Sequence, residues 1–347
     1  MSTCQDVGEF GLITRLRQWV PSTGASVVRG IGDDAAVIRW KADQLLLATV
    51  DGQVENTHFR WEWTTPEKLG RKLAAINLSD LTAMGGTPLY ALVNLVLPPE
   101  TPVTRVEAFY RGLAKELEAV SAAIVGGNFS AGAHFAADLI LMGGVLPEQL
   151  KSRAGAKKGD LLCVTGTLGK GAAGLALAKS GSPATQEEMR LLEFWQVPRA
   201  RVRAGRILAA CSEVHAVIDI SDGLAADLFH LIEAGSVGAV VDERRLPVDP
   251  AVPAVAEKLG QSALEWGLFG GEEYELLFAV AEEAMDAPLK KIKTVAPVSV
   301  IGRIVEAEAG VQLKRANGRT VPLTPGGWNH FGKLAASSMG DLEKRRI

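Results

Sequence analysis

Residues 68–84 read KLGRKLAAINLSDLTAM, and Gly85 and Gly86 follow them directly. Apolar side chains recur along this stretch at helical spacing, and glycine after the last apolar residue is typical of a helix end. The segment therefore predicts a long helix that begins after Pro66 and ends before Gly85. Asp80 lies inside this helix among apolar neighbours, where a carboxylate seldom sits without a partner. The helix thus supplies both a core element and a candidate site residue.

The segments around this helix complete an α+β domain. Residues 44–50 form an apolar run that ends at Asp51, which predicts a strand, and short apolar runs on both sides of GIGDD (30–34) predict two more. Apolar spacing predicts the remaining elements: an opening helix at 8–20, strands at 90–97 and 138–145, and a helix at 103–123. Two carboxylate-bearing loops therefore lie at strand ends, where functional residues are common.

The pattern changes between residues 147 and 159, where a polar, basic connector replaces the apolar segments. We interpret this connector as a domain boundary, with an N-terminal domain at 1–147 and a C-terminal domain at 148–347. The second half alternates strands and helices, which favours a layered α/β domain. Its predicted elements are strands at 160–165, 216–219 and 274–280 and helices at 172–179 and 224–234.

The composition is typical of a globular cytoplasmic protein without a nucleic-acid or membrane partner. The chain has 347 residues and is 47% hydrophobic, enough for two domains with separate cores. Its 37 basic and 40 acidic residues nearly balance, so the protein has no net positive charge that would attract a polyanion or an anionic membrane. No run approaches the roughly 20 apolar residues that span a bilayer. Three widely spaced cysteines without a CxxC pattern predict reduced thiols: Cys4, Cys163 and Cys211.

Several aspartates lie among glycine and apolar residues rather than in charged segments. They are Asp33, Asp34, Asp51, Asp80, Asp219 and Asp222. Four carboxylates within about 5 Å of one another would repel by roughly 3 kcal/mol per pair at an effective dielectric near 20, so a cluster needs cations. Oxygen ligands without cysteine or histidine favour Mg²⁺, which proteins hold together with nucleotide phosphates. Clustering of these aspartates would therefore indicate magnesium–phosphate chemistry.

Structural explanations also exist for these motifs. Asp33, Asp34 and Asp222 could stabilise turns or cap helices, and Asp80 could point from its helix to solvent. The segment GKGAAG at 169–174 matches the GxGxxG spacing of dinucleotide-binding turns, between a predicted strand and a predicted helix. That spacing alone is weak evidence, because tight turns use the same glycines. The residue after Lys170 is glycine rather than Ser or Thr, which excludes a Walker A loop.

Eight segments, in order and spacing, resemble the thiamine-monophosphate kinase family over nearly the whole chain. They are GEF (8–10), GIGDDA (30–35), DGQVENTHF (51–59), NLSDLTAMGG (77–86), GGN (126–128), IDISDGL (218–224), GGEEYELLF (270–278) and GWNHF (327–331). The resemblance implies the two-domain α+β fold of the aminoimidazole ribonucleotide synthetase superfamily. It also implies a homodimer in which the strands of the N-terminal α+β domain form a sheet or barrel with those of a second subunit. The C-terminal α/β domain would close over the nucleotide, with the active site in the cleft between the domains.

The resemblance also implies the site residues. Several Mg²⁺ ions would be held by Asp34, Thr49, Asp51, Asp80, Asn128, Asp219 and Asp222. ATP would contact Asp34, Thr49, Gly127, Asn128, Arg153 and Ser221, with the arginine making charge-assisted bonds to phosphate. Thiamine monophosphate would meet His58, Glu272 and Trp328. An indole face suits the cationic thiazolium ring, and Glu272 could add an opposite charge or a hydrogen bond to the aminopyrimidine.

The implied reaction is direct in-line attack by a terminal phosphate oxygen of thiamine monophosphate on the γ-phosphorus of ATP. It yields thiamine diphosphate and ADP, and we expect no covalent intermediate and no catalytic nucleophile. The acceptor phosphate is largely ionised near neutral pH, so metal charge and alignment replace a strong general base.

One segment departs from the family pattern. Many members read GlyGlyAspThr where this chain has GGNF at 126–129. Asn128 keeps an oxygen ligand but removes a negative charge, so we expect weaker occupancy of one metal position rather than loss of activity. An Asn128→Asp variant with unchanged magnesium dependence would contradict this expectation.

Other functions stay open at this point. Selenophosphate synthetases need an early cysteine and glycine loop, whereas Cys4 precedes the first motif, and hydrogenase-maturation proteins need a terminal cysteine, whereas this chain ends in EKRRI. The NTHF (56–59) and GWNHF (327–331) segments disfavour the purine synthetases. A non-catalytic ATP-binding protein and an NAD-dependent oxidoreductase are the alternatives from other classes.

Overall fold

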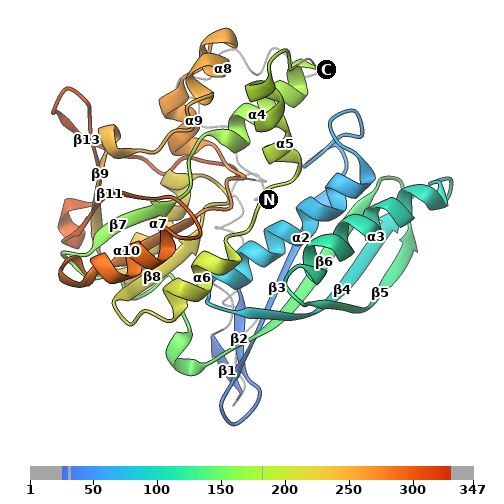
Figure 1. Ribbon diagram of the computed structural model, residues 1–347, viewed down its shortest axis with the longest axis horizontal. Helices are drawn as coiled ribbons and strands as arrows, with labels where there is room; N and C mark the ends of the chain where they lie inside the picture. Colours follow the sequence, from blue (N-terminus) through green and yellow to red (C-terminus); the bar gives the residue numbers. More distant parts are fainter. Residues whose placement is uncertain (1–25, 30–32, 182, 330–347) are drawn as a thin grey trace, which may run out of the picture.

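The computed structural model describes residues 26–29, 33–181 and 183–329, which form two β-sheets with helices packed on them (Figure 1). The helix predicted at 8–20, residues 30–32, Cys4 and the last two residues of the GWNHF segment lie outside this part. Cys163 and Cys211 are buried free thiols, as predicted. Within the described ranges, no helix combines the length and apolar character needed to cross a membrane.

The N-terminal sheet has its strands in the order β1–β2–β3–β6–β4–β5. The β4–β5 pair is parallel, and the other neighbours are antiparallel. Helices α2 (Pro66–Ala83) and α3 (Val103–Glu118) pack on each other and on one face of this sheet (Figure 1). The strands are β1 (Val27–Arg29), β2 (Ala36–Arg39), β3 (Leu45–Val54), β4 (Thr87–Leu97), β5 (Ala123–Ala131) and β6 (Ala136–Val145).

Helix α2 confirms the helix predicted at 68–84. Thr65 caps its N-terminus, where Oγ1 accepts a hydrogen bond from the Lys68 backbone N–H at 3.3 Å, and Pro66 occupies the first turn. At the other end, Gly85 has φ 77°, a left-handed conformation that glycine adopts without strain. Local chemistry therefore sets both ends of this helix.

The second helix of this half is shorter than predicted. The sequence predicted a helix at 103–123, whereas α3 ends at Glu118 and β5 begins at Ala123. The sequence analysis did not find β5. This strand lies at the edge of the sheet and is mostly exposed, so it lacks the alternation of apolar and polar residues that identifies a half-buried strand.

The C-terminal sheet has the order β13–β12–β9–β11–β7–β10–β8, and its neighbours are antiparallel except for the β9–β12 pair. Its strands are β7 (Leu161–Thr165), β8 (Val214–Asp219), β9 (Gly238–Asp242), β10 (Leu276–Val280), β11 (Val298–Val305), β12 (Val311–Lys314) and β13 (Thr320–Pro322). The helices are α4 (Lys170–Ser180), α5 (Gln186–Gln196), α6 (Val202–Ala209), α7 (Leu224–Gly235), α8 (Val252–Lys258), α9 (Ala263–Phe269) and α10 (Asp286–Ile292). The elements predicted here correspond to β7, β8, β10, α4 and α7.

Helices pack on both faces of the C-terminal sheet, which gives the expected layers. Leu162 and Val164 of β7 share a buried core with α7, whereas the alternate residues Leu161 and Cys163 share another with α6 and α10. Strands β7 and β10, which both have neighbours on either side, are buried along their whole length. This explains why they read as continuous apolar runs in the sequence.

Helix α2 also joins the two halves of the chain, as Figure 1 shows. It contacts β8, α5 and α6. Lys68 donates from Nζ to Gln196 Oε1 of α5 at 2.5 Å, and a Cβ added at Gly205 of α6 would lie 2.6 Å from the carbonyl oxygen of Thr82. The domain boundary expected at 147/148 falls between β6 and β7 and stays a prediction.

Candidate functional site

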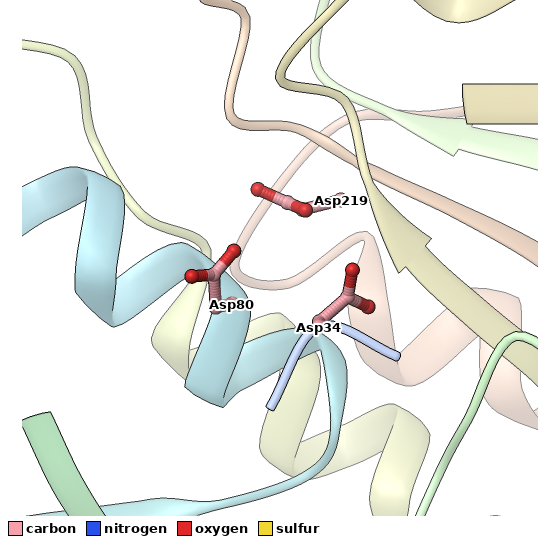
Figure 2. A group of neighbouring side chains, drawn as sticks. All are labelled: Asp34, Asp80 and Asp219. Atoms are coloured by element: carbon pink, nitrogen blue, oxygen red, sulfur yellow. The ribbon is translucent and has the colours of Figure 1, made fainter. Parts of the chain in front are cut away.

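Three carboxylates that are distant in the sequence meet at the junction between the two sheets. Asp34 lies just before β2, Asp80 lies in the last turn of α2, and Asp219 ends β8. One oxygen of each lies within 4.8 Å of the others, and Figure 2 shows the three side chains around a shared space. We call these residues the carboxylate cluster. Asp80 therefore faces the other carboxylates rather than open solvent.

Burial and repulsion make these carboxyl groups easier to protonate than free aspartate. Burial raises the pKa of Asp34 to about 7, with Arg153 opposing the rise and Asp219 adding to it. Burial likewise raises the pKa of Asp219 to about 6. For Asp80, burial and then repulsion from Asp51 raise the pKa well above its ordinary value. A bound cation would favour the ionised forms of all three.

Hydroxyl groups orient two members of the cluster. Thr49 on β3 donates from Oγ1 to Asp80 Oδ2 at 2.7 Å, and Ser79 donates from Oγ to Asp219 Oδ2 at 2.6 Å. The second bond ties α2 to the C-terminal sheet. Asp34 Oδ2 is buried and has no hydrogen-bond partner within the described ranges. A buried carboxylate oxygen of this kind, beside other oxygen donors, suits a hard cation such as Mg²⁺.

Asp51 lies beside the cluster on β3. Its backbone N–H donates to Asn77 Oδ1 at 2.9 Å, and Asn77 lies one turn before Asp80 in α2. The charge of Asp51 raises the pKa of both Asp80 and Asp219. The fold thus brings Thr49, Asp51 and Asp80 together, and their role as metal ligands stays a prediction.

The loop after β8 carries Ser221 and Asp222. Asp227, a buried residue of α7, accepts hydrogen bonds at Oδ2 from the backbone N–H groups of Ser221, Asp222 and Gly223, at 3.1, 3.2 and 3.1 Å. The charge of Asp222 raises the pKa of Asp219, so the two carboxylates are close. Sequence analysis missed Asp227, although an aspartate in the first turn of a helix is a recognisable signal.

Arg153 lies between the sheets, next to the cluster. Its Nε donates to Asp34 Oδ1 at 3.1 Å, and a terminal nitrogen of the guanidinium bonds to the same oxygen. Asp33 Oδ1 is 3.7 Å from Nε. Arg153 therefore contacts a predicted metal ligand, and its predicted contact with ATP phosphates stays a prediction.

Gly127 and Asn128 lie on β5, apart from the cluster within this chain. Strands β6 and β4 separate β5 from β3, which carries Asp51. Asn128 donates from Nδ2 to Asn94 Oδ1 and to Ser130 Oγ, both at 3.1 Å. The predicted roles of Gly127 and Asn128 in binding metal and ATP are not decided by this placement.

Two of the three predicted acceptor residues contact the 219–222 loop. The backbone N–H of Trp328 donates to Asp222 O at 3.0 Å, and that of Glu272 donates to Ser221 O at 2.7 Å. Trp328 is 47% exposed, so a ligand can reach this residue. His58 follows β3, and its Nδ1 accepts a hydrogen bond from the last backbone N–H of that strand at 2.9 Å. The neutral ring therefore carries its proton on Nε2.

The GxGxxG segment is a packing feature in the described fold. Gly169 has φ 86° at the start of α4, and a Cβ at Gly171 would lie 2.1 Å from the carbonyl oxygen of Gly271. A Cβ at Gly174 would lie 2.4 Å from Trp195 Cβ. Lys170 is buried, and its Nζ donates to Glu275 Oε1 at 2.9 Å. These contacts explain the glycines without a dinucleotide.

Family models match most of the chain. Residues 32–146 match the AIR synthase related protein, N-terminal domain, and residues 157–314 match the C-terminal domain of the same family. Curated relatives include the thiamine-monophosphate kinase of Aquifex aeolicus, which is 34% identical over 328 residues that cover 94% of this chain and 99% of the relative. The corresponding kinase of Escherichia coli K12 is 34% identical over 93% of this chain and 98% of its own length.

Solved structures agree with these matches. A structure described as AaThiL complexed with AMPPCP and TMP has a TM-score of 0.84 at 33% identity, covering 95% of this chain and 99% of its own. The thiamine-monophosphate kinase of Stenotrophomonas maltophilia K279a has a TM-score of 0.74 at 32% identity, covering 88% and 95%. A hydrogenase maturation protein HypE in complex with ATP, at 18% identity and a TM-score of 0.69, shares the fold alone.

Proposed function

Because this chain belongs to the thiamine-monophosphate kinases of the AIR synthase related family, we propose that it transfers the γ-phosphoryl group of ATP to thiamine monophosphate. The products are ADP and thiamine diphosphate. The carboxylate cluster carries this proposal, because Asp34, Asp80 and Asp219 come from both halves of the chain and meet within 4.8 Å. The structural relative that aligns with 95% of this chain was solved with the ATP analogue AMPPCP and TMP.

We infer that the cluster holds Mg²⁺ together with Thr49, Asp51 and Asp222. The donors are all oxygen atoms, and the buried Asp34 Oδ2 has no hydrogen-bond partner among the described residues, which supports this inference. When bound, Mg²⁺ would neutralise charge on the phosphate oxygens of ATP. Asn128, a further proposed ligand, contributes no charge where many family members have an aspartate.

The side chains of this protein then bind and align the two substrates. Arg153 and Ser221 lie beside the cluster, where their donor groups suit contact with phosphate oxygens. The acceptor phosphate is already ionised, so no side chain has to remove a proton from it. In-line alignment of its oxygen with the γ-phosphorus is therefore the main contribution expected from the protein.

Helix α2 spans the distance between the phosphate end and the ring end of the acceptor. Lys72 contacts Glu272 and Asp80 belongs to the cluster, so eight helical residues, or about 12 Å at 1.5 Å per residue, separate the two contacts. We propose that the acceptor phosphate faces the cluster and that the rings extend toward Glu272. Trp328 and His58 would supply further ring contacts.

We also propose a homodimer that forms through the face of the N-terminal sheet opposite α2 and α3. Val50 of β3 and Tyr90 of β4 alternate with residues buried under α2 and are 59% and 45% exposed. Exposed apolar surface of this kind is typical of an interface between subunits. A location in the cytoplasm stays a prediction from the composition.

The reaction is tested by mixing purified protein with thiamine monophosphate, ATP and Mg²⁺ and following thiamine diphosphate by chromatography. Product that EDTA abolishes would support the proposal. An Asp219→Asn variant should lose turnover, whereas Asp43→Asn, at an exposed turn between β2 and β3, should keep it. Retained ATP binding without product in the unmodified protein would favour the non-catalytic alternative.

A further inference from the structure

Two side chains that have no role in the proposed phosphoryl transfer contact the Glu272 carboxylate from two sides. Lys72 Nζ of α2 lies 2.5 Å from Glu272 Oε1, and Trp195 of α5 donates its indole N–H to Glu272 Oε2. The same ammonium lies 4.2 Å from the centroid of the Trp195 ring. Each carboxylate oxygen thus has one fixed partner, and the three side chains come from three separate segments.

Burial separates the supporting residues from the group that they support. The side chain of Lys72 is only 3% exposed and Trp195 is 1% exposed, whereas 27% of the Glu272 side chain remains accessible. A buried lysine is costly unless its charge is compensated, so a lysine at this point of α2 requires the glutamate. A ligand can reach the carboxylate, but it cannot reach the two groups behind it.

The backbone around Glu272 is fixed as well. Glu272 and Tyr274 have φ values of 62° and 51°, which residues other than glycine rarely adopt. Their N–H groups donate to Ser221 O at 2.7 Å and to Ile220 O at 2.8 Å, which holds this segment against the loop that follows β8. Backbone and side chain therefore give Glu272 one orientation relative to the carboxylate cluster.

We propose that Lys72 and Trp195 are positioning residues that hold the Glu272 carboxylate in one orientation, so that it selects acceptors that carry a ring amino group. The inference rests on the proposed function, in which the rings of thiamine monophosphate lie at Glu272. A carboxylate only accepts hydrogen bonds, and each of its oxygens has a lone pair left after the contact with Lys72 or Trp195. An exocyclic amino group can donate to it, whereas a carbonyl oxygen at the same ring position would be repelled.

The test compares three variants with a matched control on the same helix. Lys72→Met removes the ammonium, Lys72→Arg keeps the charge, and Trp195→Phe keeps an aromatic ring but removes the N–H donor. Lys68→Met makes the same change one turn earlier, at a lysine that bonds to Gln196 instead of Glu272. KM and kcat are measured for thiamine monophosphate, for ATP, and for the acceptor analogue in which oxygen replaces the exocyclic amino group.

We expect Lys72→Met to raise KM for thiamine monophosphate by about 10- to 100-fold, with kcat and the KM for ATP nearly unchanged. This factor corresponds to one charge-assisted hydrogen bond, here the bond between the ring amino group and the Glu272 carboxylate. The variant's preference for the amino acceptor over the oxygen analogue should fall by a similar factor. Trp195→Phe should shift both quantities in the same direction by a smaller factor. Lys72→Arg should restore most of the preference, and Lys68→Met should leave it intact.

An unchanged preference in Lys72→Met, or an equal change in Lys68→Met, would overturn the inference. A lower kcat together with a higher KM for ATP would indicate that Lys72 has a purely structural role. This result would also overturn the inference. If Lys72→Met does not fold, Trp195→Phe and Lys72→Arg decide by the same criteria. If the unmodified protein does not use thiamine monophosphate, the proposed function itself is rejected. If the unmodified protein is active and the variants behave like it, only the inference about Lys72 and Trp195 is rejected.

Discussion

At the scale of single residues, the half-buried Asp80 and the buried Asp227, both near the candidate site, are expected to have different roles. Asp80 is surrounded by other carboxylates and accepts one hydrogen bond, from Thr49. Asp227 accepts three hydrogen bonds from backbone N–H groups and holds the loop after β8. Repulsion favours removing the charge at Asp80, whereas three donors would lose their acceptor at Asp227. The first is therefore expected to serve the reaction and the second the fold.

Asp80→Asn should lower kcat by about 100-fold or more, because it removes one of the charges proposed to hold Mg²⁺. The metal-free variant should be at least as stable as the parent, since a like charge leaves a crowded site. Steady-state kinetics and denaturant unfolding in EDTA measure the two effects. An unfolded variant, or one with normal turnover, would contradict this prediction.

Asp227→Ala should instead destabilise the protein by about 1–3 kcal/mol per unsatisfied donor that water does not reach. The same denaturant unfolding in EDTA measures the loss. Addition of Mg²⁺ and ATP should recover part of it, because ligands that bind the folded state stabilise it by mass action. A fully stable Asp227→Ala variant would show that the three hydrogen bonds are dispensable.

At the scale of elements, α2 and α3 cross so closely that only glycine fits at the contact. A Cβ at Gly112 would lie 1.9 Å from the carbonyl oxygen of Glu67, and one at Gly70 would lie 2.0 Å from that of Phe109. Both clashing atoms belong to the backbone and cannot rotate away, so a larger residue at either position would push the two helices apart. Because α2 also carries Asp80, the separation would reach the candidate active site.

Gly112→Ala should therefore lower the free energy of unfolding by about 1–3 kcal/mol through overpacking, with a smaller effect on kcat. Thermal unfolding and kinetics test this prediction. Ala114→Gly, on the same helix but away from this contact, measures how exchange between glycine and alanine alone changes the stability of the helix. A Gly112→Ala protein as stable as its parent would mean that the helices separate at no cost.

The segment before β10 contains two buried glutamates with opposite pKa shifts. Burial raises the pKa of Glu273 to about 8, although Lys170 opposes the rise. Burial also acts on Glu275, but Lys170 and Arg201 hold its pKa below the ordinary value. Glu275 is therefore ionised at neutral pH, whereas Glu273 is largely protonated.

The raised pKa of Glu273 predicts a pH-dependent stability. Between the ordinary glutamate pKa and about 8, the folded protein holds a proton that the unfolded chain has released, so stability falls as the pH rises through this window. The slope approaches about 1.4 kcal/mol per pH unit for one proton. Glu273→Gln should lack this contribution, so the stability difference between parent and variant should change from pH 6 to 8. A constant difference would refute the prediction.

At the scale of the whole molecule, α2 and α3 cover one face of the N-terminal sheet (Figure 1), and the opposite face carries the side chains of Val50 and Tyr90, which are exposed within the described residues. Val50→Glu places a charge on this opposite face and should convert a dimer into monomers, as measured by light scattering during size-exclusion chromatography. Val103→Glu makes the same change on α3, where Val103 is 72% exposed, and should leave the mass unchanged. A monomeric parent protein would refute the proposed dimer.

The sequence predicted about half of the described helices and strands: all of those around the N-terminal sheet except β5, but only β7, β8, β10, α4 and α7 in the C-terminal half. Apolar spacing identifies an element when it shows which side of that element is buried. Helix α2 carries this signal clearly, whereas β7 and β10 are buried along their whole length and were found as continuous apolar runs. Strand β5 does not carry it, since an exposed edge strand has no buried side to record, and the predicted helix was extended into its first residue. The positive φ values of Glu272 and Tyr274 also have no signal in residue type, because packing imposes them.

By itself, the sequence determined the family and both ends of α2, because these depend on motifs in a fixed order and on local chemistry. Only the tertiary structure decided that Asp34, Asp80 and Asp219 meet, that Asn128 lies on a distant strand, and that Lys72 and Trp195 support Glu272. The spacing of apolar residues shows which side of one helix or strand is buried. Distances between elements depend instead on how the two sheets pack on α2, which no local pattern contains.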